Sequence, residues 1–161
     1  MWGITLASWL RPIAWGVAAT AIKLGKGDTL APGQTFETYV LREDFELNTL
    51  TRDKDWWERL KTQARAQPDL LLGGPSLQWV YESMREMNAL FALESPTLPC
   101  LTFLGSSEKI VDPDRIIDRM SRWPDGHLET LPGAEHEVML EIPATRAKVF
   151  DMMDAHFTAH P

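Results

Sequence analysis

Two loops of this chain carry side chains that could act together in acid–base chemistry. The first, "GSSEKIVDP", follows the apolar run at 100–105 and carries Glu108 and Asp112. The second, "PGAEHE", follows the run "GHLETL" and carries His136. A carboxylate beside an imidazole fixes its tautomer and stabilises its protonated form, so that the histidine can take a proton from a nucleophile. The two loops therefore predict an acid–histidine pair that serves a third, nucleophilic group.

This pair requires the two runs that precede the loops to be strands of one sheet. "CLTFLG" (100–105) is short, apolar and bounded by Pro and Gly, which is typical of a buried strand, and "GHLETL" alternates as a second strand. "DPDRIIDRMSRW" predicts a helix with Asp112 as its cap, and "IPATRAKVFDMMDAHF" predicts a closing helix from near Pro143. This order implies an α/β fold with a parallel sheet, and loops beyond the carboxyl ends of such strands form sites.

The first part of the chain has a different pattern and is predicted to be mostly helical. We expect one helix over 4–24 and a second from near Asp55, capped by Thr51 or Asp53. Ser76 could cap a third helix, "LQWVYESMREMNALFALE". The pattern changes at "SPTLP". We therefore divide the chain into a helical part, 1–95, and an α/β part, 96–161.

Composition excludes some classes of partner. The 161 residues have a formal net charge of -7 and contain no basic run, so a nucleic-acid-binding role is set aside. Cys100 is the one cysteine and cannot form an internal disulfide. It lies in an apolar run, and we interpret it as a buried thiol consistent with a cytoplasmic location.

The N-terminal stretch "MWGITLASWLRPIAWGVAATAIKLGKG" is predicted to be an apolar helix buried against protein. It lacks the early positive charge of a signal peptide. Its uncharged run after Pro12 is well short of the ~20 residues that span a bilayer. Trp2, Trp9 and Trp15 lie here and leave peripheral contact with a membrane interface open.

The two loops resemble known motifs. "PCLTFLGSSEKIVDP" followed by "LETLPGAEHEVMLE" resembles the C-terminal part of α/β-hydrolases of the lysophospholipase and monoglyceride-lipase type, also grouped with serine aminopeptidase-like hydrolases. That family's motif G-x-x-D/E-x-[IV]-V places its triad acid on Glu108, and its P-G-x-x-H-E motif places its triad histidine on His136. The resemblance favours Glu108 over Asp112, which has a structural role as a helix cap. It implies that residues 1–95 are the cap inserted between core strands.

The chain departs from the family at the nucleophile. The resemblance implies a serine in G-x-S-x-G upstream of the cap, and these 161 residues contain no such motif. The N-terminal half of the core is absent with it. We therefore expect Met1 to be an internal methionine of a longer protein, and the chain alone to be inactive.

Ser76 superficially offers a nucleophile, because "LLLGGPSLQW" reads as strand, tight turn and helix. Position 78 is Gln where the nucleophile turn needs a small residue, and Pro75 removes an N–H beside Ser76. No strand is available between this segment and the one that carries the acid. We interpret Ser76 as a helix cap.

No metal or cofactor site is predicted. His136 and Glu137 resemble the start of H-E-x-x-H, but position 140 is Leu.

The resemblance to α/β-hydrolases implies a hydrolase of carboxylic esters, with a lysophospholipid or monoacylglycerol-like substrate and a Ser-His-acid mechanism in the intact protein. The alternative is a truncated or degenerate, non-catalytic module that binds a lipid or a partner.

Overall fold

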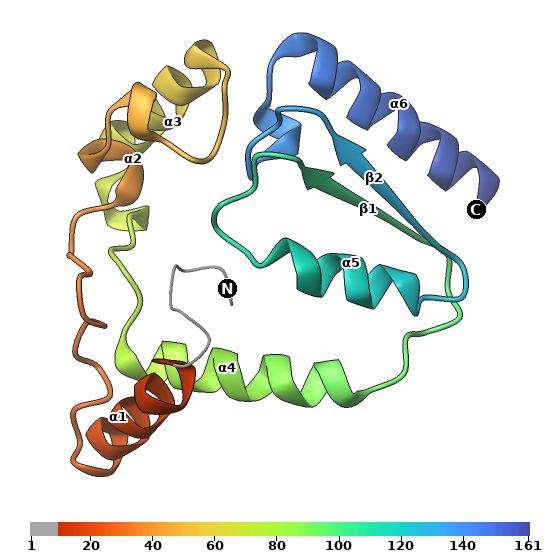
Figure 1. Ribbon diagram of the computed structural model, residues 1–161. Helices are drawn as coiled ribbons and strands as arrows, with labels where there is room; N and C mark the ends of the chain where they lie inside the picture. The colour runs from red at the N-terminus through yellow and green to blue at the C-terminus, as the bar shows by residue number, and fades with distance from the viewer. Residues whose placement is uncertain (1–9) are drawn as a thin grey trace.

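The computed structural model describes residues 10–161, which form an all-helical region (residues 10–95) followed by an α/β region (residues 96–161) (Figure 1). Residues 4–9 of the first predicted helix lie outside the described part. From residue 10 onward, no helix is both long and apolar enough to cross a membrane.

The helical region contains four α-helices in its described part. They are α1 (Arg11–Lys23), α2 (Tyr39–Arg42), α3 (Lys54–Ala66) and α4 (Leu77–Ala92), with 3₁₀ turns η2 (Phe45–Leu47) and η3 (Pro68–Leu70). Helix α1 packs on α4, with the Trp15 and Tyr81 rings edge to face at 5.1 Å, and α2 packs on α3. The short helix α2 was not predicted. Its four residues are too few to show a helical period.

Asp53 is the cap of α3, so one of the two predicted alternatives is right. Its carboxylate accepts hydrogen bonds from the backbone N–H groups of Asp55 at 3.0 Å and Trp56 at 3.1 Å. Thr51 instead donates its hydroxyl to the Leu140 carbonyl at 2.7 Å. The prediction of Thr51 as cap is therefore wrong, because a contact with the α/β region uses its hydroxyl.

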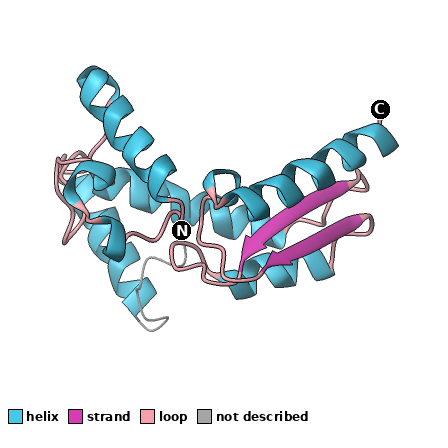
Figure 2. Ribbon diagram, turned by 90° about the horizontal axis from the view of Figure 1, so that it is seen from above, coloured by secondary structure: helices cyan, strands magenta, loops and turns pink. Residues whose placement is uncertain are grey.

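The predicted parallel sheet is confirmed. Strand β1 (Cys100–Gly105) pairs with β2 (Gly126–Leu131) from Cys100 opposite Gly126 to Gly105 opposite Leu131. Helices α5 (Pro113–Ser121) and α6 (Pro143–Ala159) lie on opposite faces of the sheet, and η4 (Val138–Leu140) precedes α6 (Figure 2). Cys100 is only half-buried, against the prediction, because it opens β1 at the end of the sheet far from the core.

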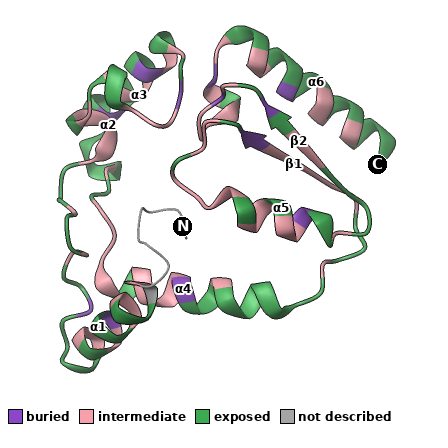
Figure 3. Ribbon diagram, in the orientation of Figure 1, coloured by how far each residue is buried: buried purple, intermediate pink, exposed green. Residues whose placement is uncertain are grey.

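The core of the α/β region lies near the carboxyl ends of the strands. Leu131, Ala134 and Val149 are buried there, and Phe103 and Met153 are among the residues that pack against them. Figure 3 shows that much of the helical region is exposed or half-buried. The best-packed part of the α/β region therefore supports the loops that follow the strands.

Gly105, the last residue of β1, has no room for a side chain. A Cβ atom there would lie 2.3 Å from the carbonyl oxygen of Ala134 and 2.4 Å from that of Glu135. Both atoms are backbone, so an alanine forces the loop that carries His136 to move. We expect Gly105→Ala to lower the free energy of unfolding by about 1–3 kcal/mol, measured by urea denaturation.

Gly16→Ala is the matched control for this substitution. A Cβ at Gly16, on an exposed face of α1, meets nothing within 4 Å. Alanine should therefore stabilise the protein slightly through its higher helix propensity. Equal effects of the two substitutions would contradict the close approach at Gly105.

Candidate active site

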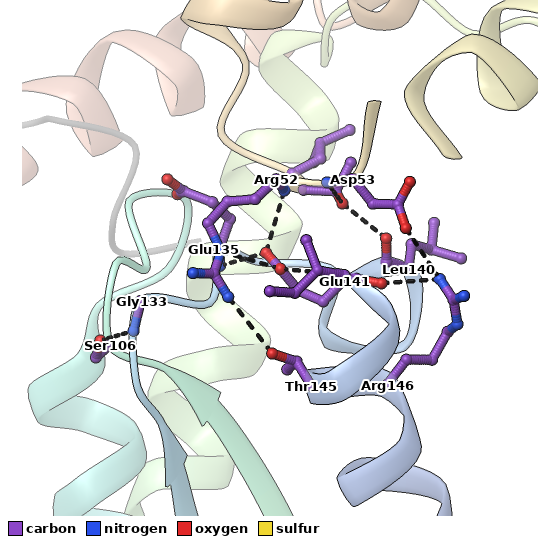
Figure 4. Close-up of polar contacts among 12 residues, drawn as sticks. Arg52, Asp53, Ser106, Gly133, Glu135, Leu140, Glu141, Thr145 and Arg146 are labelled. Carbon is purple, nitrogen blue, oxygen red and sulfur yellow. Dashed lines mark hydrogen bonds and ion pairs between the residues drawn. The ribbon is translucent and has the colours of Figure 1, made fainter. Parts of the chain in front are cut away.

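The loops after β1 and β2 are joined by hydrogen bonds. The backbone N–H groups of Ser106 and Ser107 donate to the carbonyls of Leu131 at 3.0 Å and Ala134 at 2.9 Å. The Ser106 hydroxyl accepts from the N–H of Gly133 at 2.6 Å (Figure 4). Gly133 has a φ of 70°, a left-handed conformation that favours glycine. The parallel register thus places both loops at one edge of the sheet.

The structure brings Glu108 and His136 together. Nδ1 of His136 lies 2.7 Å from Oε2 of Glu108, a distance that is typical of a charge-assisted hydrogen bond. Asp112, the other carboxylate of the first loop, caps α5 and accepts from the N–H of Asp114 at 3.2 Å. Of the two acids considered from the sequence, Glu108 is therefore the one beside the imidazole.

The Glu108 carboxylate is held in its ionised form. Its side chain is only 4% exposed, and Oε1 accepts from the backbone N–H groups of Ile110 at 2.5 Å and Val111 at 3.0 Å. Burial raises the pKa of Glu108, but the hydrogen bonds from Val111, His136 and Ile110 outweigh it, and the pKa lies below its ordinary value. A carboxylate that stays ionised can orient an imidazolium.

This lowered pKa predicts a pH dependence of stability. A carboxyl group whose pKa is lower in the folded state stabilises the fold above its unfolded pKa, and this contribution is lost as the pH falls through the folded value. We expect the stability advantage of the wild type over Glu108→Gln to be full at pH 7, to begin to fall near the ordinary value of 4.5, and to be lost as the pH passes below the lowered pKa of the folded state. Thermal unfolding midpoints of both proteins between pH 7 and pH 3 measure it. A difference independent of pH would contradict the prediction.

The backbone of His136 is held by the helical region. Its N–H donates to the carbonyl of Thr49 at 3.3 Å, and the N–H of Glu137 donates to that of Leu50 at 2.8 Å. The imidazole is 29% exposed, so it is reachable from outside. With Nδ1 engaged by Glu108, Nε2 is the nitrogen that can exchange a proton with another group.

Ser76 has the structural role expected from the sequence. It is the N-cap of α4, and its hydroxyl accepts from the N–H of Trp79 at 3.2 Å. We expect Ser76→Ala to cost about 1 kcal/mol of unfolding free energy, seen as a lower thermal unfolding midpoint. A thermal unfolding midpoint equal to that of the wild type would contradict this role.

Two polar residues beside the histidine loop were not singled out from the sequence. Glu141 is fully buried and forms an ion pair with Arg52, with Nε and Oε2 3.0 Å apart (Figure 4). The signal that could have indicated Glu141 is a single acid inside the apolar run "VMLEIP". Arg52 lies in a polar stretch that gives no such signal.

No metal site is evident in the part of the chain that the structure describes, where no three His, Cys, Asp or Glu side chains are grouped to hold an ion. A cavity of about 380 Å³ lies between α4, β1 and α5 and includes Phe91, Met120 and Trp123 in its wall. Neither Glu108 nor His136 lines it. We assign no substrate to this cavity.

Comparisons with known proteins give the family. Residues 14–143 match the family described as "Serine aminopeptidase, S33". The chain is 27% identical over 135 residues to a probable lysophospholipase L2 of Haemophilus influenzae (strain ATCC 51907 / DSM 11121 / KW20 / Rd). The aligned segment covers 83% of this chain and 42% of that protein.

A solved structure with the same fold is a soluble variant of monoglyceride lipase from Saccharomyces cerevisiae in complex with a substrate analog. The TM-score is 0.64 at 19% identity, over 99% of this chain and 55% of that one. The chain therefore spans about half the length of these relatives. Because the family match covers most of the sequence, the chain belongs to the S33 serine aminopeptidase family and has a partial α/β-hydrolase fold.

Proposed function

We propose that the chain is part of a hydrolase of carboxylic esters that works by a Ser-His-acid mechanism. The observation that carries the proposal is the 2.7 Å contact between Nδ1 of His136 and the buried carboxylate of Glu108. In this role Glu108 orients the imidazole, and His136 is the base. Residues 1–95 are the cap over the site, and residues 96–161 are the C-terminal part of the core.

In the proposed reaction a serine hydroxyl attacks the ester carbonyl carbon while Nε2 of His136 takes its proton. The tetrahedral intermediate collapses, the protonated His136 gives that proton to the leaving alcohol, and an acyl-serine remains. Water then attacks the acyl-serine with His136 again as the base. The carboxylic acid leaves, and the serine regains its proton.

The proposal also assigns the nucleophile and the class of substrate. These 161 residues contain no G-x-S-x-G, so the serine is assigned to a segment outside them. The relatives are named as a probable lysophospholipase and a monoglyceride lipase, which supports a lysophospholipid or a monoacylglycerol as substrate. Both are esters that join one acyl chain to a polar alcohol.

The coding DNA upstream of Met1 provides the first test. An open reading frame that encodes G-x-S-x-G is expected, and the longer protein should hydrolyse a monoacylglycerol or a lysophospholipid and react with a fluorophosphonate probe. The chain of 161 residues should do neither. An aminoacyl amide assayed in parallel distinguishes an esterase from an aminopeptidase, and faster amide cleavage would overturn the substrate class.

A second outcome would replace the proposal. A stop codon close upstream, together with fatty acid binding by a monomeric chain that does not react with the probe, would favour a non-catalytic lipid-binding module. Ester hydrolysis by the 161-residue chain that is abolished by Ser76→Ala would instead make Ser76 the nucleophile.

A further inference from the structure

Glu141 is a carboxylate at a position with no contact to solvent. Its side chain is 0% exposed, and charges in such places are stable only when they are paired and hydrogen-bonded. Oε1 accepts from the backbone N–H groups of Glu135 at 2.9 Å and Arg52 at 3.2 Å. Oε2 accepts from Nε of Arg52 at 3.0 Å and from the N–H of Ile142 at 3.1 Å. Both oxygens therefore have two donors.

These donors lie on both of the segments that are joined by the backbone hydrogen bonds of His136 and Glu137. Glu135 directly precedes His136, and Arg52 lies two and three residues after Leu50 and Thr49, whose carbonyls accept from Glu137 and His136. Glu141 thus forms hydrogen bonds both to the loop that carries His136 (the histidine loop) and to the segment of the helical region that supports this loop. Figure 4 shows the Arg52 and Glu141 side chains meeting between the two segments.

Thr51 and Arg146 also make contacts at the junction where the helical region meets the α/β region. Thr51 donates to the carbonyl of Leu140, and Arg146 contacts the Asp53 carboxylate at 3.3 Å and the Glu141 carbonyl at 2.8 Å. None of these reaches residues 135–137. Among the junction side chains, Glu141 is the one that hydrogen-bonds to the neighbour of His136 itself.

We propose that Glu141, paired with Arg52, is a positioning residue for His136 that couples the helical region to the histidine loop. Glu108 fixes the rotation of the imidazole, whereas Glu141 fixes the backbone from which the imidazole projects. This inference rests on the proposed function, since the position of Nε2 relative to an ester is what the coupling controls. A displacement of about 1 Å at such a group is enough to cost about a hundredfold in rate.

Amide hydrogen exchange of the 161-residue chain, followed by NMR, tests the coupling without any need for activity. In Glu141→Gln we expect the N–H groups of His136 and Glu137 to exchange about tenfold faster, because a neutral amide offers one acceptor oxygen where the carboxylate offers two. Amides within β1 should keep their wild-type rates. Asp118→Asn, which removes an exposed ion pair with Arg122 on α5, is the matched control and should change neither.

Unchanged exchange at His136 and Glu137, or an equal acceleration throughout β1, would overturn the inference and leave Glu141 a stabilising residue only. If Glu141→Gln does not fold, Arg52→Lys provides the test instead, because lysine keeps the positive charge but lacks the Nε donor to Oε2 of Glu141. The same two amides should then exchange about threefold faster.

A kinetic readout separates this inference from the proposed function. In the longer, active protein Glu141→Gln should lower kcat about a hundredfold and leave KM within about twofold, since the substrate is still bound while the base is misplaced. An active protein whose kcat is unaffected would overturn the positioning role alone. A protein with no esterase activity would overturn the proposed function, whatever the exchange data show.

Discussion

Replacing His136 by alanine is expected to lower kcat/KM for ester hydrolysis about a million-fold in the protein that contains the nucleophile. In the proposed mechanism the imidazole takes the serine proton and returns it to the leaving alcohol, and Glu108 lies 2.7 Å from its other nitrogen. Alanine removes both transfers. The residual rate should come from binding and from the remaining polarising groups. Initial rates with a monoacylglycerol measure the effect.

His127→Ala is the matched control for this substitution. His127 also lies beside a carboxylate, with Nε2 3.6 Å from Oε2 of Glu129, but it is 63% exposed on β2. A histidine–glutamate pair is therefore removed in both variants, and only one of them is at the proposed site. A loss below about tenfold for His136→Ala, or similar losses for the two variants, would rule out His136 as the base.

Glu108→Gln is expected to lower kcat about ten-thousand-fold in the same protein. Oε1 already accepts from Ile110 and Val111, so the amide oxygen must stay there and the NH₂ group must face His136. An NH₂ group donates to Nδ1 and places the imidazole proton on Nε2. The nitrogen that should accept the serine proton is then blocked, although the shape of the site is kept. Single-turnover kinetics of acyl-enzyme formation measure the effect.

Asp112→Asn distinguishes the two acids that the sequence offered. Asparagine also caps helices, so this variant should keep α5 and lower kcat by less than about threefold. Circular dichroism verifies that both variants are folded. If Asp112→Asn is the more damaging of the two, the acid is Asp112 and the contact between Glu108 and His136 is structural.

Local signals in the sequence were enough to predict the α/β region. Strands at 100–105 and 126–131 and helices beginning at Pro113 and Pro143 were all found where the sequence indicated. Short apolar runs bounded by Pro and Gly and a proline in the first turn of a helix act within a few residues, so no distant contact had to be known.

The helical region was predicted less well, because its boundaries depend on contacts between distant segments. Thr51 and Asp53 are equally good helix caps by residue type. Asp53 caps α3 in the structure, because the Thr51 hydroxyl donates to the Leu140 carbonyl instead. Helix α2 is held by packing of Tyr39 on Trp57, with ring centroids 6.1 Å apart, which no local pattern reveals.

The sequence by itself determined which kinds of residue could form the site. Carboxylates after one strand and a histidine after the next imply an acid and a base at one edge of a parallel sheet, since the pairing of such strands fixes where their ends meet. The motif resemblance already favoured Glu108 over Asp112, and the tertiary structure shows the contact between Glu108 and His136. Only the tertiary structure revealed that Arg52 and Glu141 meet beside the loop that carries His136. These contacts join residues 28 and 89 positions apart, and they depend on how loops and distant segments pack rather than on any local preference of the chain.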